Sequence, residues 1–187
     1  MDIRKIQQRI QEILSEKRFL HSLGVAEEAQ KLALHYGAAE EKAYLAGLLH
    51  DCAKEIPAEQ AMTMLEKYGI VVDEITKRTP RLLHGSLGAC ISQAEFEIID
   101  PEILDAVRFH TTGKANMNLL TKIIYIADYI EPNRRFDGVE ELRVLAYESI
   151  DSAIIKGIDY TITDLIQSGL ALHPDTIHAR NYLLLSK

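Results

Sequence analysis

The chain has 187 residues, 47% of them hydrophobic and 26% charged, which is typical of one globular domain and excludes a disordered or fibrous protein. Its formal net charge of -7 argues against a nucleic-acid-binding protein, because affinity for a phosphate backbone comes mainly from clustered Lys and Arg. The charged N-terminal segment and the absence of a long apolar run predict a cytoplasmic protein without a membrane partner. Cys52 and Cys90 form no CxxC pair and are expected to be buried free thiols.

Apolar residues at helical spacing predict four helices in the first half of the chain. Gly37 follows the second of them, where a left-handed residue commonly ends a helix. Pro57 is expected as the first residue of the fourth helix, and Gly69 as its stop. An extended or turn-like stretch then leads to Pro80. The predicted helical ranges are 3–14, 18–36, 40–51 and 57–69.

The second half of the chain continues the helical pattern. Asp100 and Pro101 suit the N-cap and first position of a helix that ends near residue 109. The Ile-rich segment 118–130 also fits a strand by periodicity alone, but its length and its neighbours favour a helix. Residues 139–169 are expected to form one long helix or two stacked ones, with Gly157 as the break. The remaining predicted helices cover 82–96 and the residues that follow His173, Pro174 and Asp175.

No alternating strand pattern, internal repeat or low-complexity linker is present in the sequence. We therefore expect an all-α, single-domain helical bundle that spans residues 1–187. A core at about 18–135 would carry the functional residues, and the helices of 139–187 would complete the bundle. The amphipathic first helix and the apolar C-terminal leucines could form a homodimer interface, although intramolecular packing explains them equally well.

Adjacent His50 and Asp51 end an apolar helix, where an imidazole and a carboxylate are costly to bury without a partner. Four other polar residues interrupt apolar segments, and all of them are His or Asp: His21, His84, His110 and Asp128. Each one alone is explained more simply as a hydrogen-bonded, half-buried side chain. The six together favour a metal site, because imidazole and carboxylate are ligands that suit iron, manganese, zinc or nickel.

The order His21, His50-Asp51, Asp128 resembles the H…HD…D signature of the HD-domain superfamily of metal-dependent phosphohydrolases. Four further segments extend the resemblance to the YqeK-like family: HDCAKEIP at 50–57, LLHGSLGA at 82–89, RFHTTG at 108–113 and ADYIEPNRR at 127–135. HPDTIHARNYLL near the C-terminus adds to it. The resemblance implies an HD-type bundle that hydrolyses diadenosine tetraphosphate and related dinucleoside polyphosphates symmetrically to two nucleoside diphosphates.

The resemblance also implies how the six residues divide their roles. His21, His50, Asp51 and Asp128 would hold the principal metal, expected to be iron, with manganese or another divalent transition metal as alternatives. His84 and His110 would complete a second metal position or bind the substrate phosphate directly, and Asp51 would bridge two ions. Whether one or two ions bind stays open. A bound metal lowers the pKa of coordinated water, which supplies a nucleophile near neutral pH.

Phosphoryl transfer needs positive groups that hold the phosphate oxygens. Arg18 lies about one helical turn before His21, Lys54 lies three residues after Asp51, and a turn could return Arg134 or Arg135 to the site. A solvated surface charge is the competing interpretation of each. The expected catalytic residues are Asp51, His84, His110 and Lys54. Substrate contacts are expected from Arg18, His21, Lys54, His84, His110, Asp128, Arg134 and Arg135, and loop 169–175 is a candidate for the nucleoside pocket.

Three functions compete at this stage. The first is the symmetrical tetraphosphatase, with a nucleotide substrate as its partner. The second is a related HD enzyme that acts on guanosine tetra- or pentaphosphate or on deoxynucleoside triphosphates. The third is a metal- and nucleotide-binding sensor without turnover, and a purely structural bundle without a function at this site is the remaining alternative. No Walker loop, Rossmann fingerprint or nucleophile elbow is present, so phosphate binding by a backbone cradle has no support in the sequence.

Overall fold

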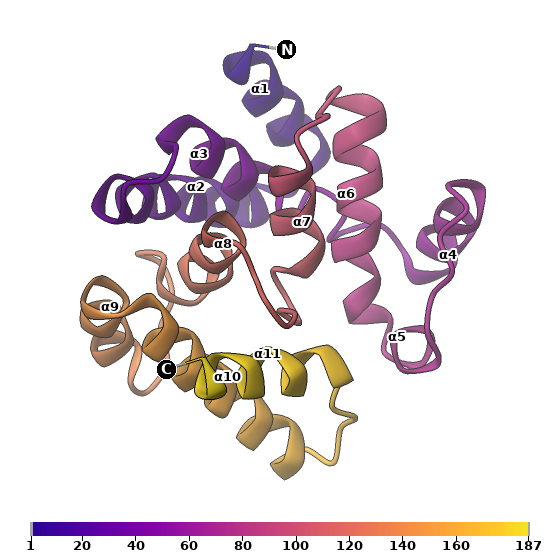
Figure 1. Ribbon diagram of the computed structural model, residues 1–187. Helices are drawn as coiled ribbons and strands as arrows, with labels where there is room; N and C mark the ends of the chain where they lie inside the picture. The colour runs from indigo at the N-terminus through magenta and orange to yellow at the C-terminus, as the bar shows by residue number, and fades with distance from the viewer. Residues whose placement is uncertain (1, 187) are drawn as a thin grey trace.

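The protein is described by a computed structural model that covers residues 2–186, and within this range all regular secondary structure is helical (Figure 1). Eleven α-helices and one 3-10 turn follow one another along the chain. They are α1 (Ile3–Ile13), α2 (Glu16–Tyr36), α3 (Glu40–Leu49), α4 (Ala58–Lys67), α5 (Glu74–Arg78), η1 (Pro80–Leu82), α6 (Leu83–Glu95), α7 (Pro101–Phe109), α8 (Leu119–Ile130), α9 (Val139–Glu148), α10 (Ile150–Gln167) and α11 (Pro174–Leu185).

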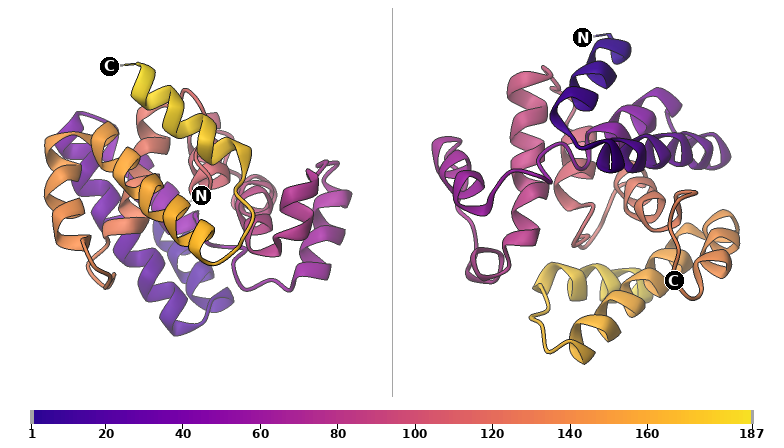
Figure 2. Two further views of the ribbon diagram at one scale, coloured as in Figure 1. Left: turned by 90° about the horizontal axis from the view of Figure 1, so that it is seen from below. Right: turned by 180° about the vertical axis from the view of Figure 1, so that it is seen from behind.

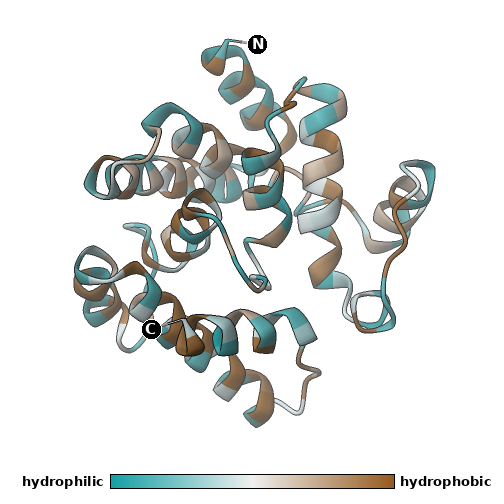
Figure 3. Ribbon diagram, in the orientation of Figure 1, coloured by the Kyte–Doolittle hydropathy of each residue, from teal (hydrophilic) through white to brown (hydrophobic). Residues whose placement is uncertain are grey.

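Helix α8 is the centre of the bundle and packs against α2, α3, α7, α9 and α10. Residues 123–127 in its middle are fully buried. Because this part of the helix is covered on every side, its sequence is apolar all round and shows no separate polar face. Asn118 caps the N-terminus by accepting from the backbone N–H of Thr121. The helical prediction for this segment is confirmed. Hydrophobic residues lie where the helices face one another and hydrophilic residues cover the outer turns (Figure 3).

The last three helices, α9 to α11, form a second layer below α8, as seen in Figure 1. Helices α10 and α11 contact each other and lie side by side in both views of Figure 2. This layer leaves a space between itself and the ends of the helices above it, and that space is the pocket described below.

The predicted helix break in the second half of the chain is wrong. Gly157 lies inside α10 beside the Tyr129 ring, which a Cβ at this position would meet at an ordinary contact distance of 3.7 Å. The break is at Ser149, whose backbone is extended and whose hydroxyl accepts from the N–H of Ser152. An N-cap therefore ends one helix and starts the next, and glycine is not needed.

The stretch before Pro80 also differs from the prediction, because it contains the short helix α5 and the turn η1. Asp73 starts α5 by accepting from the backbone N–H groups of Ile75 and Thr76. A single helical turn of this kind depends on its cap and is too short to show an apolar period. Pro57 is the N-cap of α4, so this helix starts at Ala58, one residue later than predicted.

The packing of α1 and the state of the two cysteines agree with the sequence. Ile6 and Ile10 of α1 are buried in the chain's own core, as intramolecular packing predicts. Cys52 and Cys90 are free and buried, as predicted. Among the described residues, no helix has both the length and the apolarity that a membrane crossing requires.

Candidate metal centre

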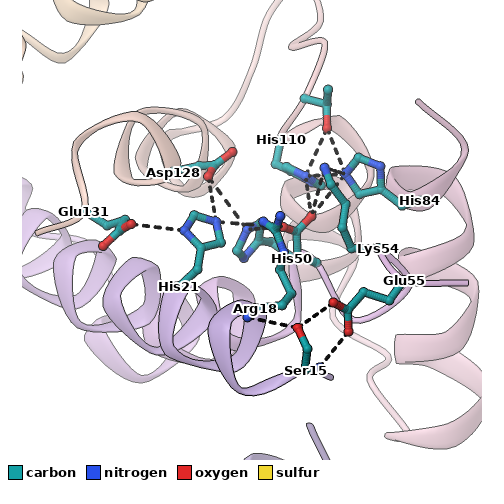
Figure 4. A network of polar contacts seen from close by, with 12 residues as sticks. Ser15, Arg18, His21, His50, Lys54, Glu55, His84, His110, Asp128 and Glu131 are labelled. Carbon is teal, nitrogen blue, oxygen red and sulfur yellow. Dashed lines mark hydrogen bonds and ion pairs between the residues drawn. The ribbon is translucent and has the colours of Figure 1, made fainter. Parts of the chain in front are cut away.

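The six candidate ligands lie on α2, α6 and α8 or just after the C-terminal ends of α3 and α7, and these five helices meet at the site (Figure 4). Two of the histidines are at helix C-termini: His50 directly follows α3, and His110 directly follows α7. His84 lies in the first turn of α6, and Asp51 begins the turn after α3. The structure brings all six side chains together: His21, His50, Asp51, His84, His110 and Asp128.

Three of the four histidines are oriented by the backbone three residues earlier. His50 Nδ1 lies 2.6 Å from the carbonyl oxygen of Gly47, and His110 Nδ1 lies 2.8 Å from that of Val107. His84 Nδ1 makes the same contact with Arg81 at 2.7 Å. A carbonyl oxygen only accepts, so each of these rings carries a proton on Nδ1 and turns Nε2 toward the site.

Asp51 is the central carboxylate and its two oxygens face different groups. Oδ1 lies 3.1 Å from His84 Nε2 and 3.5 Å from His110 Nε2. Oδ2 lies 3.4 Å from His50 Nε2 and 3.8 Å from His21 Nε2. This carboxylate therefore separates the histidines into two pairs, and each pair has one oxygen of Asp51 beside it.

The second carboxylate, Asp128, faces the first of these pairs. Its Oδ1 lies 3.0 Å from His21 Nε2 and 3.9 Å from His50 Nε2. Burial alone would raise the pKa of Asp128, but the adjacent His21 ring and the charges of Arg134 and His50 outweigh it and hold this pKa far below its usual range. Asp128 is therefore ionised at any pH at which the protein is expected to work.

Burial and neighbouring charges also set the pKa values around Asp51. Burial opposes ionisation of Asp51, yet His50, His110 and His84 outweigh burial and hold its pKa well below the usual range. Burial lowers the pKa of His84 to about 4 despite the nearby Asp51 carboxylate, and His110 and Lys54 add to this. The site thus presents ionised carboxylates beside a neutral imidazole at His84, the protonation states in which these groups bind metals.

A metal ion fits this arrangement on two observations. The buried atoms His21 Nε2, His50 Nε2 and Asp51 Oδ1 make no well-formed hydrogen bond, although other polar atoms of the centre lie close to them, and this is costly for buried polar atoms. His84 Nε2 and His110 Nε2 lie 2.9 Å apart, although their protons are on Nδ1 and lone pairs face each other. A cation would stabilise both. Three overlapping sets of ligand atoms lie close enough for one ion each: His21, His50 and Asp51; His50, His110 and Asp128; and Asp51, His84 and His110.

Of the four predicted basic residues, Lys54 and Arg134 reach both the centre and the pocket. Lys54 Nζ lies 3.1 Å from His84 Nε2 and 3.6 Å from Asp51 Oδ1. Arg134 forms an ion pair with Asp128 and donates from Nε to the backbone oxygen of the same residue at 2.7 Å. Each side chain is about one third exposed, at 32% for Lys54 and 38% for Arg134.

The other two basic residues lie elsewhere. Arg18 donates to Asp51 Oδ2 at 2.7 Å but does not line the pocket, so it contacts the centre from outside the pocket. The structure does not bring Arg135 to the site. Its guanidinium donates to the backbone oxygens of Pro132 and Arg134, and it lines a separate surface hollow beside α9. The turn after α8 directs only one of the two adjacent arginines to the pocket.

The pocket has a volume of about 490 Å³ and lies between the metal centre and the C-terminal layer. His110, Asp128, Lys54 and Arg134 line one side of it. The opposite side has aromatic, hydroxyl and acidic side chains that the sequence did not single out, namely Phe136, Tyr160, Thr161 and Asp164. Ala171 and His173 of the loop 169–175 also line the pocket, where the sequence placed a candidate nucleoside site.

Two residues within the centre itself were missed. Thr111 Oγ1 lies 3.0 Å from His110 Nε2 and 3.2 Å from His84 Nε2. Glu131, treated in the sequence only as part of a turn, is 2% exposed and its Oε1 lies 3.2 Å from His21 Nδ1. An acidic residue directly after the apolar helix α8 is the signal that could have identified it.

Comparison with known proteins agrees with the fold. The HD-domain family model matches residues 18–133. A solved structure from Clostridium acetobutylicum, described as a predicted HD superfamily hydrolase involved in NAD metabolism, is 45% identical. It superposes with a TM-score of 0.98 over 100% of this chain and 99% of that one. The predicted all-α, HD-type fold is confirmed.

Three relatives share the name symmetrical bis(5'-nucleosyl)-tetraphosphatase. The relative from Halalkalibacterium halodurans is 42% identical over 174 residues, which cover 93% of this chain and 92% of the relative. The Bacillus subtilis relative is 38% identical over 94% of each chain. The Staphylococcus aureus relative is 39% identical over 97% of this chain and 94% of its own. The chain therefore belongs to the HD-domain family of metal-dependent hydrolases, in the branch of the relatives named symmetrical bis(5'-nucleosyl)-tetraphosphatase.

Proposed function

We propose that this chain hydrolyses diadenosine tetraphosphate and related dinucleoside polyphosphates at the central phosphoanhydride, which gives two nucleoside diphosphates. One observation carries the proposal: a carboxylate, Asp51, has one oxygen beside each of two histidine pairs, next to a pocket lined by Lys54 and Arg134. The pocket volume of about 490 Å³ suits one nucleotide half of such a substrate. The names of the relatives supply the substrate class.

His21, His50, Asp51 and Asp128 would hold the principal metal ion in this proposal. Asp51, His84 and His110 would hold a second ion, or the two histidines would bind phosphate directly. We propose iron as the principal metal, with manganese or another divalent transition metal as the alternative, because histidine and carboxylate donors suit all of them. When bound, such an ion lowers the pKa of coordinated water and so supplies the nucleophile near neutral pH.

The chain's own residues bind and orient the phosphates. Lys54 lies beside His84 and Arg134 beside Asp128, both line the pocket, and they would hold the phosphate oxygens on which charge develops. Arg134 is held in place by Asp128. Arg18 would fix the orientation of Asp51 and contribute no substrate contact, because it donates to Oδ2 from outside the pocket.

The opposite wall would bind the nucleoside. The rings of Phe136 and Tyr160 lie edge to face with 6.3 Å between their centroids, and both line the pocket. An aromatic face at this position can stack on a purine base. Asp164 on the same wall can accept a hydrogen bond from an exocyclic amino group such as that of adenine.

A turnover assay with identified products tests the proposal. The protein is loaded with iron or manganese and incubated with diadenosine tetraphosphate, guanosine tetra- and pentaphosphate, and deoxynucleoside triphosphates. Two equal nucleoside diphosphates from diadenosine tetraphosphate are the expected result. Release of pyrophosphate or tripolyphosphate as the main reaction would favour the related HD enzymes, and nucleotide binding without turnover would favour a sensor. Equal activity of an Asp51→Ala variant would show that the site is elsewhere.

A further inference from the structure

His21 differs from the other three histidines of the centre in how its ring is held. The Nδ1 atoms of His50, His84 and His110 each contact a backbone carbonyl three residues earlier. His21 Nδ1 instead contacts the Glu131 carboxylate, which follows α8 and is 110 residues away in the sequence. Figure 4 shows Glu131 and Asp128 on either side of the His21 ring.

The Glu131 carboxylate is fixed on several sides. Its Oε2 accepts from the backbone N–H of Asn133 at 2.7 Å, and the side chain is almost completely buried. Arg143 of α9 donates to the backbone oxygens of Ile130 and Glu131, both at 2.9 Å, and to that of Arg134 at 3.2 Å. A guanidinium thus holds the turn from which the carboxylate extends.

Helix α2 leaves space for this carboxylate at Gly24, one turn after His21. A Cβ at this position would lie 2.7 Å from Glu131 Oε2, a distance that Cβ atoms do not tolerate. Glycine lowers helix stability in a helix interior, so its presence at a buried position needs a packing reason. The approach of the Glu131 carboxylate to α2 provides that reason.

We infer that Glu131 is a positioning residue for the metal ligand His21. A carboxylate only accepts, so it holds the proton on His21 Nδ1 and turns Nε2 toward Asp128 and Asp51. Its negative charge also makes the imidazole a stronger donor than a carbonyl partner would. The inference rests on the metal centre of the proposed function but not on the identity of the substrate.

Two matched variants test this role. Glu131→Gln removes the charge and leaves either His21 Nδ1 or the Asn133 N–H facing an amide NH₂ group. Glu28→Gln is the control, because Glu28 is also a buried glutamate, accepts from Tyr147 and Lys31, and contacts none of the six ligands. Co²⁺ affinity is measured by competition with a chelating dye, and thermal unfolding of the metal-free proteins is measured in parallel.

We expect Glu131→Gln to weaken Co²⁺ binding by about 10- to 100-fold, the usual effect of losing an outer partner of a metal ligand. Glu28→Gln should bind Co²⁺ as the unaltered chain does. Equal affinity in all three proteins would overturn the inference. Equal weakening in both variants would also overturn it, because burial of a glutamate would then explain the effect without any contact to His21.

A measurement on the unaltered chain guards against misfolding of the variant. The ¹⁵N NMR spectrum of the zinc-loaded protein should show His21 with its proton on Nδ1, and binding of zinc through Nδ1 would overturn the inference. Failure of the proposed function would give a different experimental result from failure of this inference. A chain that binds Co²⁺ through a Glu131-dependent site but does not cleave diadenosine tetraphosphate would refute the substrate and leave the role of Glu131 intact.

Discussion

The two walls of the pocket differ in composition and in how their side chains are held. The wall built by residues 54–134 adjoins the metal centre and includes an imidazole, a carboxylate and three cations, two of which contact the candidate ligands. The wall contributed by residues 136–176 consists of aromatic, hydroxyl and acidic side chains from α10 and its neighbouring loops. The difference suggests that one wall performs the chemistry and the other recognises the nucleoside. Changes in the first should then lower kcat, and changes in the second should raise KM.

The largest effect is expected from Asp51→Ala, which removes the carboxylate shared by both histidine pairs. A metal centre supplies several kcal/mol of transition-state stabilisation. At about 1.4 kcal/mol for each factor of ten, kcat should fall by about a thousandfold or more. Metal content and turnover of the purified variant are measured together, with circular dichroism to verify the fold. Turnover near the unaltered rate would show that the chemistry lies outside this wall.

Lys54→Met should have the next largest effect. Loss of one preorganised donor to a developing charge typically costs about 10²- to 10³-fold in kcat. Metal content should stay close to that of the unaltered chain, because Lys54 is a cation beside the ligands and does not itself bind metal. Arg135→Met is the matched control, since Arg135 lies outside the pocket. Equal losses in both variants would point to a general effect of surface charge.

Phe136→Ala tests the opposite wall. Stacking on a base contributes about 1–3 kcal/mol, so KM for diadenosine tetraphosphate should rise by about tenfold or more while kcat changes little. Ile166→Ala on α10 serves as the control, because Ile166 is 63% exposed and does not line the pocket. Steady-state kinetics separates the two constants. A fall in kcat at constant KM would contradict the division between the walls.

The smallest effect concerns the contact between the N-cap residues of α5 and α11. Asp73 Oδ2 lies 3.3 Å from His173 Nε2. Burial opposes ionisation of Asp73, but the hydrogen bonds from Thr76 and the neighbouring His173 together outweigh it and lower its pKa. A lowered folded-state pKa adds stability above the unfolded-state value of about 3.9, and this stability is lost as the pH falls further. The free energy of unfolding should therefore fall less steeply below about pH 4 in Asp73→Asn than in the unaltered chain, as urea titrations at several pH values would show.

Much of the first wall could be predicted from sequence, because His and Asp stand out when they interrupt apolar helices such as α8, which carries Asp128 in its last turn. The second wall could not. Phe136 and Tyr160 are ordinary residues until the packing of α10 against α8 brings them to the pocket. Local patterns failed for a related reason at Ser149, where a cap divides two helices that have one continuous apolar period. Which of Arg134 and Arg135 faces the site likewise depends on the conformation of a turn.

The contacts of His50 and His110 with carbonyls of their own helices have a dynamic consequence. Gly47 and Val107 lie in the last turns of α3 and α7, where carbonyl oxygens have no partner within the helix. Each imidazole therefore ends a helix and directs a ligand atom with the same hydrogen bond. Fraying of either helix end would therefore also break the hydrogen bond that orients the imidazole. Metal loading should then slow hydrogen exchange in the C-terminal turns of α3 and α7 more than in α10 or α11.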